Sequence, residues 1–402
     1  MSTQKITFLK EMCLKAFSLL LASIIWLPML HCFFKPAPES LISHKKLAPM
    51  AKMLAKRHLK LWTDPQMRKK ELDKMQQSNP EWDFMSRTYF VLALANIALH
   101  NESFKDKALE IMDLIIDNTL KLEAEKGPEH FLLDYAKDAP WIIRPARSQF
   151  LDGEIAIMLA ARRFLQEKEA YKKLLLERTE LMLDRMNKSS VLCSESYPDE
   201  CWTFCNSVSI AAICMCEILD KKDYSAFIKN WLTTAKNKLV DKKTGILISA
   251  FAVDGTPTPA GFGPEGTTIW MVCNMLQIVD KEFAQNQYLL AKKELGRAFL
   301  GFGFSREWPE SCMGTPDVDS GPIIPYFDAS AAASGLAILA ASAFNDKEYL
   351  MQLITSLNFA GFPAQKNGEL RYQASNPVGD AVLLYAMVSG PLWDEVERRA
   401  KP

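Results

Sequence analysis

The segment SESYPDECWTFCN, residues 194–206, gathers side chains that can transfer protons: two cysteines, three acids, a tyrosine and serines. Asp199 and Glu200 are candidate general acids or bases. An apolar, helix-like run follows at once, so we expect Thr203 to be a helix N-cap and Cys205 to lie in the first turn. A helix N-terminus lowers the pKa of a thiol, which makes Cys205 a candidate nucleophile or proton-transfer group. The competing interpretation is structural, with Cys205 packed between helices and both acids acting as caps.

A second group of acids lies in the glycine- and proline-rich segment GTPDVDSGPIIPYFD. Asp317 and Asp319 alternate, so in an extended segment both project to one face. Two nearby carboxyl groups can have separated pKa values, giving one acid and one base, which is what protonation of a leaving oxygen requires. Loop turns held by the same two side chains are the alternative.

Other residues are candidates for binding a substrate rather than for moving protons. Asp152 lies in the early turns of the inner run that begins at Arg147, and it would be a buried acid if it faced the inside of a barrel. Aromatic side chains in long loops would form the wall of a cup; they are Trp141, Tyr197, Trp202, Trp308 and Tyr326.

These candidates sit between elements that repeat about every 50–60 residues, the sign of a repeat architecture. An apolar run rich in small residues is followed by a charged, amphipathic run, which predicts a buried inner helix and an exposed outer helix. The inner runs are 83–99, 147–165, 203–219, 267–279, 329–344 and 376–389, and 392–400 is expected to be a short remnant of the last outer partner.

Six such pairs predict an all-α fold, an (α/α)6 toroid of six helical hairpins, with a one-dimensional helical solenoid as the alternative. The longest connections, 123–146, 240–266 and 302–327, all lead into inner helices. Loops of that length inside a compact domain are usually functional. We therefore expect an acid-bearing, aromatic cup at the N-terminal ends of the inner helices.

The apolar N-terminus is expected to lie outside this globule. Lysines precede an apolar span at about 16–34, close to the ~20 residues that cross a bilayer. We predict a membrane anchor over 1–40, a helical lead-in over 41–80 and the barrel over 81–402. A cleaved signal peptide is the alternative. The basic-then-apolar order favours an extracytoplasmic barrel, although lysines flank both sides of the span.

Composition excludes some classes of protein. The 402 residues carry 48 basic and 48 acidic side chains, so nothing favours nucleic acid as a partner. Five histidines without metal-ligand spacing argue against a histidine-built zinc site. Nine cysteines leave two alternatives open: a Cys193–Cys201 disulfide in an exported domain, or isolated buried thiols.

The stretch YPDECWTFCN resembles the loop-to-helix junction of the linalool dehydratase/isomerase family of (α/α)6 barrels. Pro198, Cys205 and Asn206 match the family's proline, second cysteine and asparagine, and Ser196 stands where the family has its first cysteine. The resemblance implies acid–base dehydration and isomerisation of a terpene alcohol without metal or organic cofactor. It also implies a homo-oligomer, because in the family a neighbouring subunit can complete the site.

Together these features favour a membrane-anchored, cofactor-independent lyase or isomerase that acts on a small terpenoid-like alcohol. Cys205 and Ser196 would flank the substrate, and Asp317 or Asp319 would move protons. One alternative is a glycoside hydrolase or polysaccharide lyase that uses loop carboxylates. The other is a non-catalytic, membrane-anchored binding protein.

Overall fold

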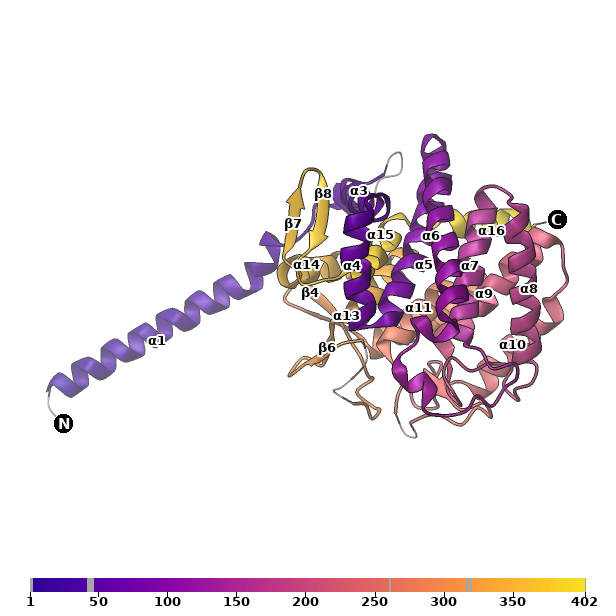
Figure 1. Cartoon of the computed structure of the whole chain (residues 1–402). Helices are drawn as coiled ribbons and strands as arrows, with labels where there is room; N and C mark the ends of the chain where they lie inside the picture. Colours follow the sequence, from indigo (N-terminus) through magenta and orange to yellow (C-terminus); the bar gives the residue numbers. More distant parts are fainter. Residues whose placement is uncertain (1–2, 42–46, 260–261, 316–317, 319, 402) are drawn as a thin grey trace.

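Six apolar helices form a closed ring in the computed structural model, which describes residues 3–41, 47–259, 262–315, 318 and 320–401 (Figure 1). They are α5 (Pro80–His100), α7 (Gln149–Leu165), α9 (Thr203–Asp220), α11 (Gly266–Leu276), α13 (Ala331–Ala343) and α15 (Pro377–Val388). Each packs against the next in this order, and α15 packs against α5. Every residue of α7 is buried, as expected for a helix that is enclosed on all sides. The predicted (α/α)6 toroid is confirmed, because a solenoid would not close.

A second layer of helices surrounds the ring. It contains α6 (Lys105–Lys126), α8 (Glu169–Met186), α10 (Ser225–Lys238), α12 (Lys281–Glu294) and α14 (Lys347–Ala360). Of these, α6, α8, α12 and α14 each pack on the inner helix that precedes them in the chain. The helix α10 buries only Ile228, Trp231 and Ala235, so it presents one apolar stripe to the barrel and a charged face to solvent.

The sixth outer position is filled from the N-terminal side of the chain. The helix α3 (Pro49–Thr63) packs against α15, and α4 (Pro65–Ser78) leads from α3 into α5. The C-terminal helix α16 (Pro391–Ala400) instead contacts α5, α7 and α9. The Leu392 N–H donates to Asn96 Oδ1 at 2.9 Å, and Arg399 Nη2 donates to the Phe164 carbonyl at 2.7 Å. The prediction that 392–400 partners the last inner helix is therefore wrong: α16 crosses the C-terminal ends of the ring.

Long connections with short strands gather at the opposite end, before the inner helices. Two 3-10 turns, η3 (Pro128–Phe131) and η4 (Asp134–Lys137), precede α7 at this end. A third, η2 (Glu102–Phe104), joins the C-terminal end of α5 to α6 and so belongs to the other end of the barrel. An antiparallel sheet in the order β3-β4-β6-β5 precedes α13. The strands are β1 (Cys201–Trp202) paired with β2 (Ala250–Phe251), β3 (Gly296–Phe299), β4 (Phe302–Arg306), β5 (Ile323–Ile324), β6 (Ala329–Ser330), and β7 (Pro363–Lys366) paired with β8 (Glu369–Tyr372).

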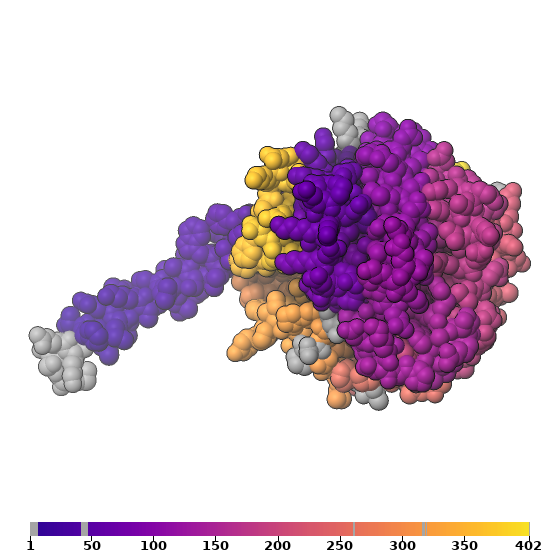
Figure 2. Space-filling view, in the orientation of Figure 1, coloured from indigo at the N-terminus to yellow at the C-terminus, as the bar shows by residue number. Residues whose placement is uncertain are grey.

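An apolar helix, α1 (Thr3–Met29), precedes the barrel and is followed by η1 (Leu30–Phe33) and α2 (Pro38–Leu41). Figure 2 shows it projecting from the globule. The helical stretch Thr7–Leu41 is long and apolar enough to cross a membrane, and its most apolar window is not buried. A signal sequence has the same properties. The helix α9 meets the same criteria of length and composition, but it is largely buried in the ring.

Candidate functional site

A cavity of about 1270 Å³ lies at the N-terminal ends of the inner helices. Early residues of all six inner helices line it, from Glu81 on α5 to Val378 on α15. The long connections supply the rest of the wall. The cup is therefore at the end of the barrel that the loop lengths predicted.

The wall of this cavity is largely apolar. Trp202, Phe262, Phe304 and Trp308 contribute rings to it. The Trp308 indole N–H donates to the Thr315 carbonyl at 2.9 Å, and its ring meets Phe262 edge-on at 5.5 Å between centroids. An apolar wall with a few polar groups is the usual lining of a small-molecule site.

Cys205 lies in the first turn of α9 and lines the cavity, with 6% of its surface exposed. Burial raises the pKa of its thiol well above the usual value, and the neighbouring Ser196 hydroxyl only partly opposes this. The expectation of a lowered pKa is wrong, because loss of water outweighs the helix N-terminus. Thr203 is likewise not the cap: it is the first residue of α9, and its hydroxyl donates to the Ile248 carbonyl at 2.5 Å. Cys205 therefore carries its proton at neutral pH.

Three glutamates from separate parts of the chain reach the cavity: Glu81, Glu200 and Glu265. The Tyr197 hydroxyl donates to Glu81 Oε1 at 2.5 Å, and the Trp202 indole N–H donates to Glu200. Glu200, Tyr197, Trp202 and Trp308 were predicted from the sequence and do line the cavity. Glu81 and Glu265 were not predicted, because an acid at the start of a helix ordinarily has a structural explanation.

Two more ionisable groups lie deeper in the ring. Tyr89 lines the cavity, and burial, followed by the charge of Glu154, raises the pKa of its phenol. Glu154 on α7 is buried, which raises the pKa of its carboxyl to about 7. The Thr88 side chain lowers this pKa by a smaller amount. Among the described residues, neither the Tyr89 hydroxyl nor Glu154 Oε2 has a hydrogen-bond partner. Nothing in the sequence distinguishes Tyr89 from the other residues of its apolar run, and Glu154 has a structural explanation as an acid near a helix N-terminus.

Several predicted site residues lie elsewhere. Asn206 is buried beneath the loop, where it bonds to Ser194 in both directions and to the Trp202 carbonyl at 2.9 Å. Asp199 is exposed and accepts from the Val253 N–H at 3.3 Å. Trp141 packs partly buried against the core outside the cavity, and Tyr326 is fully exposed. Ser196 is buried beside Cys205 without lining the cavity.

Asp317 and Asp319 lie outside the described residues, so their predicted role stays a prediction.

Asp152 faces an arginine cluster and not the cavity. It is fully buried and receives Arg147 Nη2 at 2.7 Å and Arg178 Nη1 at 2.6 Å, and Arg185 Nη1 lies at 3.8 Å. Glu123 on α6 pairs with the first two arginines from the other side. The idea that Asp152 faces inward is corrected: it ties α7 to α6 and α8.

All nine cysteines lie among the described residues, and none of them forms a disulfide. Cys193 and Cys201 are free and buried, and burial raises the pKa of Cys193 to about 12. Within the described residues, no group of three or more histidines, cysteines and acids is placed to hold a metal ion.

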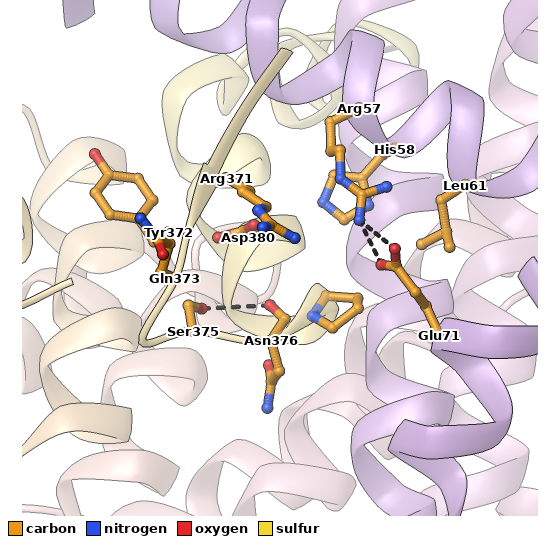
Figure 3. A pocket seen from close by; sticks show the side chains of 11 residues that line it. Arg57, His58, Leu61, Glu71, Arg371, Tyr372, Gln373, Ser375, Asn376 and Asp380 are labelled. Carbon is orange, nitrogen blue, oxygen red and sulfur yellow. Dashed lines mark hydrogen bonds and ion pairs between the residues drawn. The ribbon is translucent and has the colours of Figure 1, made fainter. Parts of the chain in front are cut away.

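A smaller cleft of about 190 Å³ lies between α3–α4 and the start of α15 (Figure 3). The Arg57 guanidinium pairs with both Glu71 oxygens at 2.5 Å on one side. Burial raises the pKa of Asp380 to about 7 and, with the charge of Arg57, lowers that of His58 to about 3. His58 on α3 is therefore neutral near pH 7, and Asp380 on α15 is about half protonated there.

No known protein family matches the chain, and no curated protein matches it. Among solved structures, a GH76 alpha-mannanase from Bacteroides thetaiotaomicron is similar, with a TM-score of 0.46 and 11% sequence identity. The alignment covers 78% of this chain and 87% of the mannanase. At this similarity the comparison says nothing about the substrate of the present chain.

Proposed function

We propose that this protein is a cofactor-independent lyase or isomerase that acts by proton transfer on an apolar, terpenoid-like alcohol. One observation carries the proposal: a protonated thiol, Cys205, faces a large apolar cavity whose wall also holds the carboxyl groups of Glu81 and Glu200. The apolar wall suits a hydrocarbon skeleton, and the polar groups suit its hydroxyl. The short resemblance around Cys205 and Asn206 points to the same chemistry.

These groups account for every proton that the proposed dehydration transfers. The Cys205 thiol donates its proton to the leaving hydroxyl, the carbon–oxygen bond breaks, and water departs. Glu81 or Glu200, as carboxylate, takes a proton from the adjacent carbon, and a carbon–carbon double bond forms. That proton returns to the Cys205 sulfur and completes the cycle. Ser196 acts as a positioning residue, because its hydroxyl adjoins the thiol without reaching the cavity.

The test is turnover of a panel of terpenoid alcohols by the detergent-solubilised full chain, with hydrocarbon products measured by gas chromatography. Cys205→Ser should lower kcat by at least about 100-fold, in the range of a lost general acid. Cys214→Ser is the matched control, because Cys214 is a buried thiol of the same helix that does not line the cavity. Full turnover in a Cys205→Ala variant would exclude the mechanism.

A second candidate, a glycoside hydrolase, is favoured by the three glutamates on the wall. Two carboxyl groups about 5–9.5 Å apart across a sugar can perform hydrolysis. The same variants separate the two candidates when oligosaccharides replace alcohols. Sugar cleavage that survives Cys205→Ser and is lost in Glu200→Gln would establish the hydrolase. If neither panel is turned over but a ligand binds, the chain is a binding protein.

We further propose that α1 anchors the chain in a membrane with the barrel on the extracytoplasmic side. The apolar, unburied stretch Thr7–Leu41 motivates this. Resistance to alkaline extraction, together with cleavage of the barrel by protease added from outside, would support it. A mature chain that begins after this stretch would identify a signal peptide instead.

A further inference from the structure

A cluster of exposed apolar side chains lies next to the point where α1 reaches the barrel. Between 37% and 62% of the surface of each is exposed. We name this cluster the apolar face; its members are Phe299, Leu300, Ile324, Phe327, Phe359 and Phe362. They come from the β3–β4 hairpin, the β5–β6 segment and the end of α14. Exposed aromatic groups in such number mark an interaction surface more often than an ordinary solvent-facing one.

The chain segment after α1 is packed directly onto this face. The Phe34 ring meets Phe359 at 5.1 Å and Phe302 at 6.5 Å between centroids. Asn358 Nδ2 donates to the Phe34 carbonyl at 2.9 Å. The His31 ring lies against Gly301 at the tip of the hairpin, where a β-carbon would meet it. Figure 1 shows α1 leaving the barrel beside β4, β7 and α14. A bilayer that held α1 would therefore be within reach of the apolar face.

The same face adjoins the large cavity. The Phe327 ring lies 5.9 Å from Phe304, which lines the cavity, and 6.4 Å from Phe299 on the surface. Ile324 belongs to both: it is half exposed and also lines the cavity. Gly361, between α14 and Phe362, lines the cavity too. Apolar side chains thus run without interruption from the surface to the site.

We propose that the apolar face docks on the lipid bilayer, with the cavity rim at Ile324 and Gly361 turned toward it. The inference deepens the proposed function and rests on its membrane anchor. Aromatic rings favour the boundary between head groups and acyl chains, and the fully exposed Tyr326 hydroxyl would reach the head groups. Docking of this kind buries an apolar surface about 5–10 Å into that boundary. The lipid phase would then be the source of an apolar ligand.

The experiment places a fluorophore on the face of the full chain, reconstituted in dioleoylphosphatidylcholine vesicles that contain doxyl-labelled phosphatidylcholine. A nitrobenzoxadiazole label is attached at Tyr326→Cys or Phe362→Cys in a background where Cys13, Cys32 and Cys312 are replaced by serine. Lys173→Cys is the matched control, because its exposed side chain lies on α8, away from the face. We expect the doxyl lipid to quench both face labels by more than about half, as insertion into the boundary requires. The label at position 173 should be unaffected.

The outcomes separate the alternatives. A chain that floats with the vesicles but is quenched no more at the face than at position 173 overturns the docking face alone. A chain that does not float overturns the anchor and the face together. Cross-linking between two chains through Tyr326→Cys, without lipid quenching, would make the face a dimer interface and overturn the proposal. No substrate is used, so the result is independent of whether alcohol turnover is found.

Discussion

The Tyr197 hydroxyl donates a 2.5 Å hydrogen bond to the carboxylate of Glu81, which lies 116 positions earlier in the chain. The same oxygen accepts the Leu133 N–H at 3.0 Å. One phenol thereby joins the start of α5, the connection before α7 and the loop before α9. The Tyr135 ring stacks on it at 4.3 Å. This side of the cavity is one hydrogen-bonded unit, which fixes Glu81 at the mouth.

Removing that hydroxyl should destabilise the fold. Tyr197→Phe leaves the Leu133 N–H without its acceptor, and we expect a loss of about 1–3 kcal/mol in the free energy of unfolding. Urea titration measures it. Tyr326→Phe is the control, because the loss of this exposed hydroxyl should change the free energy of unfolding by less than about 0.5 kcal/mol. Equal stability of the two variants would contradict the joining role.

The Cys205 thiol should react slowly with iodoacetamide near pH 7. Burial raises its pKa well above the usual value, so little thiolate is present. We expect its rate to be at least about tenfold below that of the partly exposed Cys312 and to keep rising above pH 9. Mass spectrometry of labelled peptides gives both rates in one sample. Rapid labelling of Cys205 at neutral pH would restore the activated-thiolate hypothesis.

Glu154 should make stability depend on pH. Its pKa is raised from 4.5 to about 7 in the folded state, so the native protein binds more protons than the unfolded chain between these values. The stability it provides is full below pH 4.5 and falls as pH rises through 7. As pH rises from 4.5 to 8, the free energy of unfolding of Glu154→Gln should increase by up to about 3 kcal/mol relative to that of the wild type. A pH-independent difference between the two proteins would contradict burial of an uncompensated acid.

We expect Asp152 to stabilise the fold and to have no part in catalysis. Asp152→Asn removes the charge shared by Arg147 and Arg178, and breaking such a buried pair costs about 3–5 kcal/mol. Glu110→Gln, which breaks the exposed pair with Lys107, should cost less than about 1 kcal/mol. Denaturant titration compares them. A folded Asp152→Asn protein with normal stability and no turnover would instead assign Asp152 to the site.

Gly153 should be needed for close packing of α7 on α9. A β-carbon there would lie 2.5 Å from Ser209 Oγ and 3.3 Å from the Cys205 carbonyl. We expect Gly153→Ala to lower stability by about 1–3 kcal/mol through overpacking. Adding Ser209→Ala removes the closer contact and should recover part of the loss, which thermal unfolding can measure. If stability is not recovered, the contact with the Cys205 carbonyl, and not the contact with Ser209, prevents a β-carbon at position 153.

The ring itself was predictable, because each inner helix is apolar on all sides and recurs at a regular spacing. The partner of α15 was not. The apolar stripe of Met50, Leu54 and Leu61 shows that α3 packs against another element. The sequence does not show that this element is α15, which lies more than 300 residues further along the chain. The position of Cys205 in a first turn was also predictable. Its pKa was not, since the groups that exclude water from it come from other helices.

Some of the carboxylates in the site were predictable from the sequence and others were not. Glu200 was found because it lies beside the cysteine motif. Glu81 was missed, since its link to Tyr197 exists only after two distant segments meet. Asp152 looked like a site residue because its arginine partners, Arg178 and Arg185, lie on another helix. Charge alone does not tell which face of a helix an acid occupies.

The helix α15 closes the ring against α5 and also packs against the outer helix α3, and this affects how the protein folds during synthesis. During synthesis α3 and α5 leave the ribosome early, while the helix that covers both is among the last to emerge. The nascent chain therefore carries two uncovered apolar flanks through most of translation. Contacts so distant in sequence form slowly, and exposed apolar surface of this kind is what chaperones bind. A ribosome stalled before Pro377 would hold an open crescent of helices, and only release of the final segment would turn it into a barrel.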